Sequence, residues 1–242
     1  MKKLLSLLLL TGTLFAQANN VFTLNPSVNS AGMGNVGIAN ADVKNVFHNP
    51  AFAGLRESHQ EVSYVDWLPN LTDDMGYQSI LYTSDLGWSS ELFYFNYGEQ
   101  TQSDQYGVIL GDFESASFRI SGGWGFGYKD WLVGARLNLY NHSFIDDFDI
   151  DMNYGFDIGA YKEFGDTSIG IVLKDVGGET KFLDQELNLP MSVGIGVGHK
   201  IGNFTLASDV KVFEDYNSIG LGGQYDLGIA SLKLGYYTES EF

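Results

Sequence analysis

The sequence of 242 residues has no cysteine, few basic residues and, beyond its first 18 residues, no long hydrophobic run. The lack of cysteine excludes both a lipoprotein and a domain held together by disulfides. Without an apolar run of about 20 residues, the mature chain cannot cross a bilayer as a helix. Any membrane-spanning structure must therefore be a closed barrel of strands, because only helices and barrels satisfy every backbone polar group in lipid.

Basic residues are scarce, since 13 Lys and Arg stand against 30 Asp and Glu and give a net charge of −17. Removal of Lys2 and Lys3 with the leader described below leaves 11 basic residues and a net charge of −19. Such an acidic chain repels the phosphate backbone, which argues against nucleic acid as a partner. The acidic residues gather between the predicted strands, as at 144–151, and this favours loops at the rim of a membrane protein.

Residues 1–18 are organised as a secretory signal peptide. Lys2 and Lys3 supply the positive charge, residues 4–10 form an apolar core interrupted only by Ser6, and residues 16–18 (Ala-Gln-Ala) form a small-x-small cleavage site. The apolar core is too short to span a bilayer as a helix. We therefore expect an exported mature chain that begins near Asn19.

The most frequent pattern in the sequence is an alternation of apolar residues with small or polar residues, repeated from Ser117 to Tyr237. Within 131–140, the odd-numbered positions place Trp, Val, Ala, Leu and Leu on one face of a strand. The even-numbered positions place Leu, Gly, Arg, Asn and Tyr on the other face. A period of two predicts β-strands. Strands of about ten residues with one apolar face and one small or polar face are typical of a transmembrane β-barrel. The sequence predicts an all-β, antiparallel barrel with about eleven recognisable strands.

Charged residues within these strands avoid the apolar face. An Arg or Lys that faces lipid at mid-depth costs about 2–4 kcal/mol, so this avoidance is informative. The residues that we expect to face the lumen are Arg119, Arg136, Asp157, Lys174, Asp209, Lys211 and Lys233. A soluble two-sheet sandwich would also direct charges outward, although its strands are shorter, about 5–6 residues. That alternative would place four aromatic residues in a dry core, namely Trp124, Phe126, Trp131 and Tyr154.

Residues 19–57 do not alternate and are rich in small residues, with a turn signal at Asn49-Pro50. We predict that they form a compact segment with one short helical piece, which plugs the barrel formed by residues 58–242. The stretch 88–97 carries apolar residues on both faces, including Phe93 and Phe95. This is expected if one face meets lipid and the other meets the inserted segment.

The stretch 30–37 (Ser-Ala-Gly-Met-Gly-Asn-Val-Gly), followed by Asn49-Pro50-Ala51, resembles the N-terminal signature of FadL-like outer-membrane proteins. The similarity is closest to the PorV/PorQ branch of these proteins and covers most of the mature chain. Further similarities to that branch lie at 61–64, 67–68, 155–159, 189–190 and 234–236.

This resemblance implies a barrel of about 12–14 strands with an N-terminal plug, so that the chain would stop two or three strands early. It also implies a set of residues that hold the shape of the plug, namely Gly32, Met33, Gly34, Gly37, Asn49 and Pro50. Members of the PorV/PorQ branch serve type IX secretion, in which they handle cargo or help to attach it at the outer membrane.

Residues that could carry catalysis or bind a metal do not form a recognisable set. His48, His59, His142 and His199 are scattered without metal-ligand spacing, and neither a Ser-His-acid set nor a G-x-S-x-G motif is present. The acidic alternation at 147–153 lacks the Gly and Glu that a calcium loop requires. We therefore predict a protein that is not an enzyme and has no cofactor or metal.

The leading hypothesis is a non-enzymatic protein of the outer membrane, in contact with its lipid, that assists type IX-like secretion by docking secretion machinery or secreted cargo. It predicts a closed lumen and a partner surface on loops such as 141–150 or 175–190. The alternative is a FadL-like channel for uptake of a hydrophobic small molecule. It predicts an apolar pocket between plug and wall, lined by Phe93, Phe95 and residues of the plug.

Overall fold

The computed structural model describes residues 21–67, 74–104, 106–144, 152–177, 179–182 and 185–241. The expected signal peptide (1–18), residues 145–151 of the acidic stretch and Phe242 lie outside the described residues. Within the described residues, no helix has both the length and the apolar character needed to cross a bilayer.

In the part of the chain that the structure describes, eleven antiparallel strands form one sheet in which each strand is hydrogen-bonded to the sheet strands that precede and follow it. Their bounds are β1 His59–Asp66, β2 Gly76–Thr83, β3 Trp88–Ser103, β4 Ile109–Tyr128, β5 Trp131–Phe144, β6 Asn153–Phe164, β7 Thr167–Gly177, β10 Ser192–Ile201, β11 Phe204–Phe213, β12 Tyr216–Asp226 and β13 Ser231–Glu241. A separate hairpin, formed by β8 (Glu179–Phe182) and β9 (Gln185–Asn188), lies between β7 and β10 in the chain.

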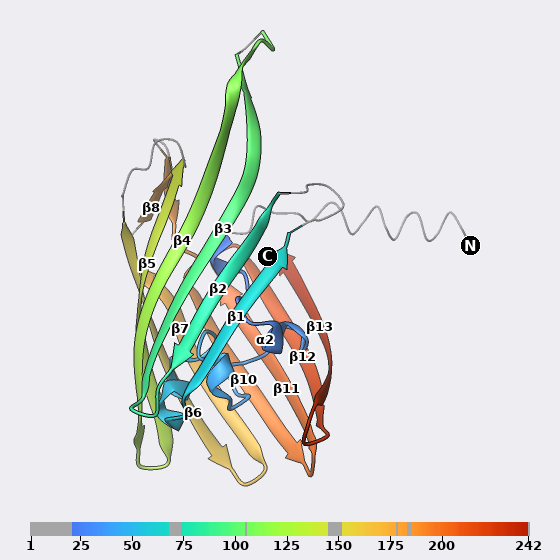
Figure 1. Ribbon diagram of the computed structural model, residues 1–242. Helices are drawn as coiled ribbons and strands as arrows, with labels where there is room; N and C mark the ends of the chain where they lie inside the picture. Colours follow the sequence, from blue (N-terminus) through green and yellow to red (C-terminus); the bar gives the residue numbers. More distant parts are fainter. Residues whose placement is uncertain are drawn as a thin grey trace, which may run out of the picture.

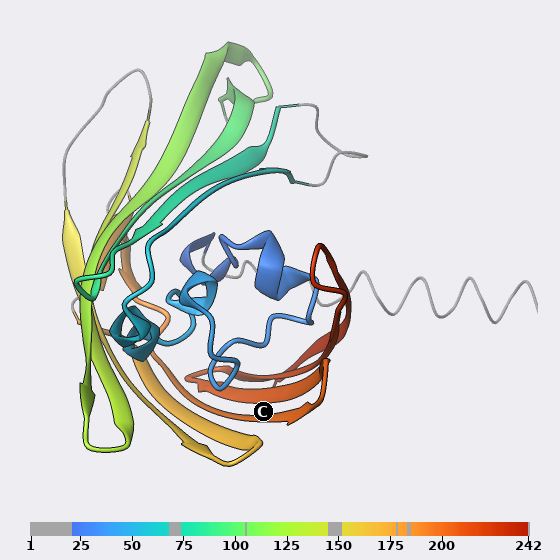
Figure 2. The same cartoon turned by 60° about the horizontal axis from the view of Figure 1, so that its bottom comes forward.

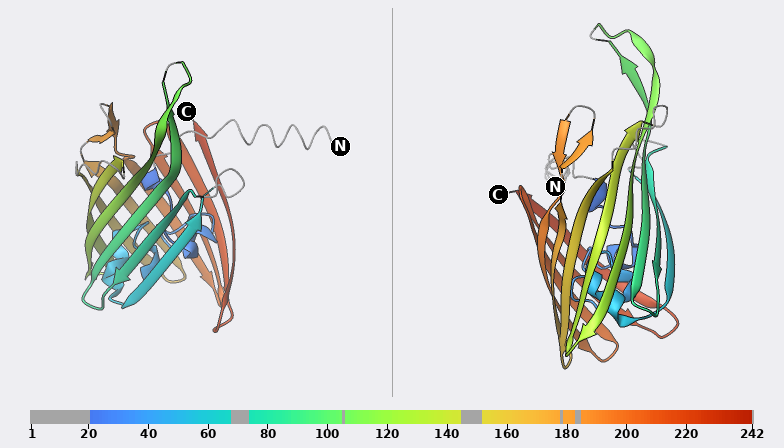
Figure 3. Two further views of the ribbon diagram at one scale, coloured as in Figure 1. Left: turned by 45° about the horizontal axis from the view of Figure 1, so that its top comes forward. Right: turned by 90° about the vertical axis from the view of Figure 1, so that its left-hand side faces the viewer.

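The sheet curls into a barrel wall around the N-terminal segment, with β1 and β13 as its two edges (Figures 1 and 2). The predicted all-β, antiparallel barrel fold and the count of eleven strands are confirmed. The larger number of strands implied by the family resemblance stays a prediction. Strands β3 and β4 are longer than expected, because their sequences at 98–103 and 109–117 do not follow the two-residue alternation. Their hairpin projects beyond the other strands (Figure 3).

Alternation along the strands places apolar side chains on the convex face of the wall. Ile171, Ile195, Val210 and Ile219 pair in register across four neighbouring strands, and each is between 37% and 52% exposed. Trp124 and Tyr154, which a soluble sandwich would bury, are also exposed. The sandwich alternative is therefore wrong for this chain.

The N-terminal segment, residues 21–58, lies on the concave side of the wall (Figure 2). It contains three 3-10 turns, η1 (Val21–Thr23), η2 (Val43–Asn45) and η3 (Pro50–Leu55), and one helical turn, α2 (Val28–Ala31). Ser27, Asp42 and Asn49 precede three of these turns, and each side chain accepts a backbone N–H two residues later. A short polar side chain thus caps the start of each of these three turns.

The region around α2 contacts both edges of the sheet. The Ser27 hydroxyl donates a hydrogen bond of 2.9 Å to Glu61 on β1, and the Lys233 ammonium on β13 donates to the carbonyl oxygen of Asn29. The same ammonium also contacts the Asn29 side chain. The two edge strands, which lie far apart in the chain, are therefore linked through one helical turn.

Candidate functional site: the contact between segment and wall

Glycines on the concave face of the wall allow the N-terminal segment to approach closely. A methyl group at Gly134, Gly170 or Gly222 would collide with the backbone of the segment at Pro50, Ile38 or Met33 respectively. The alternating glycines at 194, 196 and 198 serve the same purpose around Ile38 and Ala39. These glycines are therefore required by backbone contact between two parts of the chain.

Charged side chains of the wall bind backbone groups of the segment. One carboxylate oxygen of Asp209 accepts the N–H groups of Gly37 at 2.7 Å and Ile38 at 2.9 Å. Arg119 donates to the carbonyl oxygen of Phe22 at 2.7 Å, and Lys211 donates to that of Asn35 at 3.1 Å. The segment has little regular structure of its own, so the wall satisfies several of its buried backbone groups.

Three buried cations surround the ring of Phe47 in the segment. The charged groups of Lys174, Arg119 and Arg136 lie 3.7, 4.7 and 5.2 Å from its centroid. Arg136 also donates to the Phe47 carbonyl oxygen at 3.1 Å. Such cation–π contacts are worth about 2 kcal/mol or more where water is excluded. Phe47 is therefore the residue of the segment around which several charged side chains of the wall gather.

Acidic side chains balance two of these cations. Glu91 pairs with Arg119 at 2.5 Å, and Asp157 pairs with Arg136 at 2.6 Å. Asp157 also accepts the backbone N–H of Asp175 at 2.8 Å. All of these side chains are buried, and Arg136 also lies 3.5 Å from Glu91, so the arrangement is a continuous, buried polar network across several neighbouring strands.

Asn49 and Pro50 start η3 and lie against the wall. The Asn49 amide donates to the carbonyl oxygens of Ile38 at 2.9 Å and Ala160 at 3.2 Å, and its oxygen accepts the N–H of Ala51. Pro50 occupies the first position of the turn, where its missing N–H costs nothing. This pair therefore fixes η3 to both the segment and β6.

The structure places the other residues singled out by sequence at this same contact. Met33 and Gly34 lie against Gly222 and Gly235 of the wall, and Gly34 has a positive φ of 69° that favours glycine. Gly32 lies beside the Lys233 side chain, and Gly37 donates to Asp209. All seven charged residues that we expected to face the lumen have side chains that contact the segment or the polar network beside it. Asp157 and Lys174 belong to that network.

Sequence reasoning missed Glu91, Phe47 and Asp175, which complete the network. Glu91 lies on β3 among residues that are apolar on both faces, and Phe47 lies in a segment without periodicity. Asp175 has a positive φ of 55°, close to an irregularity in the pairing of β6 with β7. An acidic residue inside an otherwise apolar strand was the one available signal for Glu91.

Phe93 and Phe95 pack tightly instead of lining a pocket. They are 0% and 2% exposed and form a cluster with Phe22, Tyr77 and Tyr140. The apolar pocket expected between segment and wall at these two residues is therefore filled by side chains. Phe22 belongs to the segment, so the apolar inner face of β3 packs against the segment.

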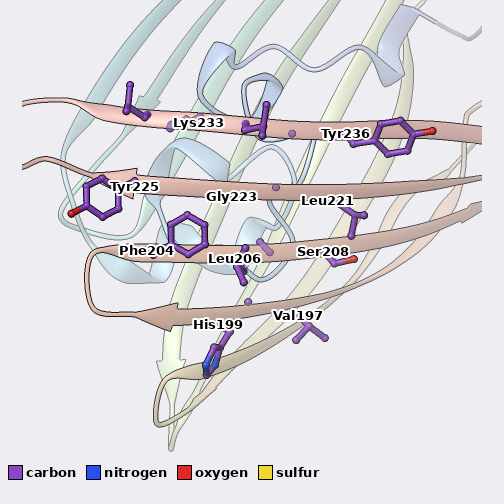
Figure 4. Close-up of a pocket in the computed structure, with 16 residues that line it drawn as sticks. Val197, His199, Phe204, Leu206, Ser208, Leu221, Gly223, Tyr225, Lys233 and Tyr236 are labelled. Atoms are coloured by element: carbon purple, nitrogen blue, oxygen red, sulfur yellow. The ribbon is translucent and has the colours of Figure 1, made fainter.

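A groove and a small internal cavity accompany this arrangement. A groove of about 910 Å³ lies along β10–β13, around Gly223, and includes Phe204, Leu206 and Leu234 (Figure 4). A smaller cavity of about 40 Å³ lies inside, between the segment and the wall, beside Lys174 and Lys211. Within the described residues, no group of His, Cys, Asp or Glu is arranged to hold a metal ion.

The fold and this contact define the protein as an antiparallel β-barrel wall that encloses its own N-terminal segment. No known protein family and no curated protein matches the sequence. Among solved structures, the toluene transporter TbuX of Ralstonia pickettii is similar with 14% identity and a TM-score of 0.48, over 90% of this chain and 79% of that one. A porin refined at 1.8 Å is similar with 15% identity and a TM-score of 0.38, over 74% of this chain and 61% of the porin.

Proposed function

We propose that this protein is an outer-membrane β-barrel whose convex face contacts lipid. Large apolar side chains are exposed on the strands all along the wall, from Val62 on β1 to Tyr236 on β13. Soluble monomers rarely expose apolar patches larger than a few hundred Å². Charged residues gather instead on the concave face, which is the distribution that a bilayer favours.

Within that class, we propose a non-enzymatic role of the PorV/PorQ type, as a docking partner in type IX-like secretion. The observation that carries this proposal is the filled interior. The resembling residues Gly34, Gly37, Asn49 and Pro50 all bind or touch the wall, and the segment is held there by many hydrogen bonds. A barrel so filled is suited to present surfaces to a partner rather than to conduct solute.

The β3–β4 hairpin is the candidate docking surface. It projects beyond the other strands (Figure 3) and exposes apolar side chains near its tip, among them Tyr106, Ile109 and Leu110. Exposed apolar residues on a projecting hairpin are typical of protein contact sites. Secretion machinery or a secreted cargo protein would bind there. The sequence had pointed to loops at 141–150 and 175–190 for this role, and these stay untested.

Deletion of the gene tests the secretion role. We expect a set of exported proteins to move from the cell surface and medium to the periplasm, as measured by quantitative proteomics of the fractions. Complementation with the wild-type chain should restore export, and complementation with the Tyr106→Ser, Ile109→Ser double variant should not.

The matched control is Leu227→Ser with Ile229→Ser, two exposed apolar residues in the turn between β12 and β13. This control should restore export fully. A distribution of exported proteins that does not change on deletion of the gene would contradict the secretion role.

A separate experiment tests the membrane barrel itself. The protein should leave the membrane fraction only in detergent, and its electrophoretic mobility should shift on heating; these two results would establish a folded barrel.

The alternative function is uptake of a hydrophobic small molecule, and the groove along β10–β13 favours it. The groove is lined mainly by apolar side chains and is open because Gly223 has no side chain between Phe204 and Leu206. Filling it with Gly223→Leu should slow uptake of an apolar tracer by cells several-fold if this function is correct. Uptake equal in the wild type and the deletion strain would exclude it.

A further inference from the structure

The wall has a seam, which is the space between its two edge strands, β1 and β13. In the ranges that the structure describes, β1 pairs only with β2, and β13 pairs only with β12. One backbone edge of each strand therefore faces the seam without a neighbouring strand. In hydrocarbon, backbone N–H and C=O groups without hydrogen bonds are costly. In the membrane location proposed above, on which this argument rests, such an edge requires a partner.

Side chains on the edge strands are exposed more than those of the strands next to them. Tyr236 on β13 is 63% exposed, and its partner in register on β12, Leu221, is 51% exposed. Val62 on β1 is 77% exposed, and its partner on β2, Ile80, is 51% exposed. The apolar face of both edges therefore lacks the cover that one further strand would supply.

The N-terminal segment is also exposed at the seam. The region around α2 forms hydrogen bonds with both β1 and β13, and Figure 1 shows α2 between these strands. Val28, Ala31 and Gly32 are exposed. By contrast, Ile38 and Asn49, which lie against the wall, are fully buried. The small residues of α2 allow a strand to approach the segment closely, as the glycines of the wall do elsewhere.

The number of strands determines the direction in which a partner strand must run. The eleven strands of the described sheet pair antiparallel in chain order, so β1 and β13, the first and the last, run in the same direction. Direct pairing of the two edges would be parallel, whereas one added strand can run antiparallel to either edge. Antiparallel pairing is slightly more stable per residue than parallel pairing.

A second copy of the chain does not offer such a strand at its own edges. Two copies inserted into a membrane in the same sense present edge strands that all run in one direction. Pairing between the copies through β1 or β13 would therefore be parallel. A strand from a different protein has no such restriction, so it is the occupant that the geometry favours.

We propose that the seam accepts one β-strand of another protein, which pairs antiparallel with β13 and lies over α2. Because β13 has 11 residues, a strand of similar length fits. Its apolar side chains would face lipid beside Leu234 and Tyr236, and its small or polar side chains would face inward beside Gly235. In strand addition, backbone hydrogen bonds provide affinity and alternate side chains provide specificity. This site is separate from the β3–β4 hairpin.

A synthetic peptide tests whether β13 accepts a strand. The probe has the sequence of residues 216–226, which already alternates and pairs with β13 on its other side. Because the chain has no cysteine, one Cys in the full-length mature protein and one in the peptide report which positions meet. Oxidation with copper phenanthroline should join peptide Leu221→Cys to protein Tyr236→Cys, and peptide Tyr225→Cys to protein Leu232→Cys. Each of these combinations should exceed the crossed combinations several-fold, because the strands are antiparallel.

The matched control is Ile195→Cys in the protein. Ile195 is exposed on the same face, but its strand, β10, has a neighbour on each side. This variant should form a disulfide with neither peptide. In protein that shows the heat-dependent mobility shift, yields on β13 no greater than that at 195, or greater for the crossed combinations, would overturn the proposal. Absence of the mobility shift would instead contradict the proposed membrane barrel.

Photo-crosslinking in native membranes tests the proposed occupant. p-Benzoylphenylalanine replaces Leu232 in one variant and Tyr236 in another, and the adducts are mapped by mass spectrometry. Both adducts should fall in one alternating segment of another protein, with the adduct of position 236 nearer the N-terminus of that segment. Capture of a protein without this order would overturn the proposal, as would adducts with lipid or with this chain alone.

Discussion

Asp209 shows how a single side chain of the wall shapes the segment beside it. One of its carboxylate oxygens accepts two consecutive backbone N–H groups, those of Gly37 and Ile38. Two adjacent donors aimed at one oxygen fix the local path of the chain more tightly than one bond would. The bonds are charge-assisted and buried, so each is stronger than a bond between neutral groups.

Asp209→Ala should therefore destabilise the folded barrel by about 3 kcal/mol, because two buried N–H groups lose their acceptor. The measurement is urea-induced unfolding in detergent, followed by the mobility shift on unheated gels. Asp215→Ala is the control, since Asp215 is exposed between β11 and β12. Equal midpoints for the two variants would show that Asp209 does not hold the segment.

Residues of this kind also show what the sequence could and could not predict. Arg136 and Asp157 were predictable because the two-residue alternation places each of them on the polar face of its strand. Phe47, which contacts Arg136, was not predictable, because an aromatic residue in a segment without periodicity carries no mark of the cations around it. Pairing across 90 residues of chain, as between Arg136 and Val46, depends on how the sheet curls rather than on local pattern.

At the scale of elements, the glycines of the strands differ in what lies beside them. Some contact the backbone of the segment, and others face open space. Gly134 on β5 touches the backbone of η3 at Pro50, whereas Gly127 on β4 has open space where a side chain would stand. Both lie in alternating strands, and the sequence alone does not separate them. The alternation assigns glycines to the small or polar face of a strand, but which of them are indispensable required the position of the segment.

Gly134→Ala should lower the free energy of unfolding by about 1–3 kcal/mol, because the added methyl group forces the segment away from the wall. Gly127→Ala should change it by less than about 0.5 kcal/mol. Thermal unfolding of the two variants under identical detergent conditions gives the comparison. Equal losses would mean that the effect comes from strand propensity and not from contact with η3.

At the scale of the whole molecule, the wall separates two environments across its thickness. The convex face is apolar along its strands, and the concave face holds ion pairs and the folded segment. The alternation predicted this division because a strand sends successive side chains to opposite faces. The sequence did not predict which residues of the segment and of the wall meet, since that depends on contacts between residues far apart in the chain.

A membrane environment for the convex face implies that the cost of a charge depends on depth. Ile195 lies in the middle of β10, and Ile201 lies at its end on the same face, with exposures of 52% and 58%. Ile195→Lys should destabilise the barrel in lipid vesicles by about 2–4 kcal/mol, and Ile201→Lys by about 0–1 kcal/mol. Equal and small effects of the two substitutions would indicate that this face meets water.

The link through α2 has a consequence for the order in which the molecule assembles. Asn29 and Lys233 are separated by 204 positions in the chain, and Gly37 and Asp209 by 172. Contacts this remote form late, because the entropy of closing so long a loop must be lost before any of their binding energy is gained. The segment is synthesised before any strand, yet it has no complete set of partners until β13 has been made. We therefore expect residues 21–58 to be the last part of the chain to gain protection from amide hydrogen exchange during refolding, and the wall to acquire its final curvature only at that moment.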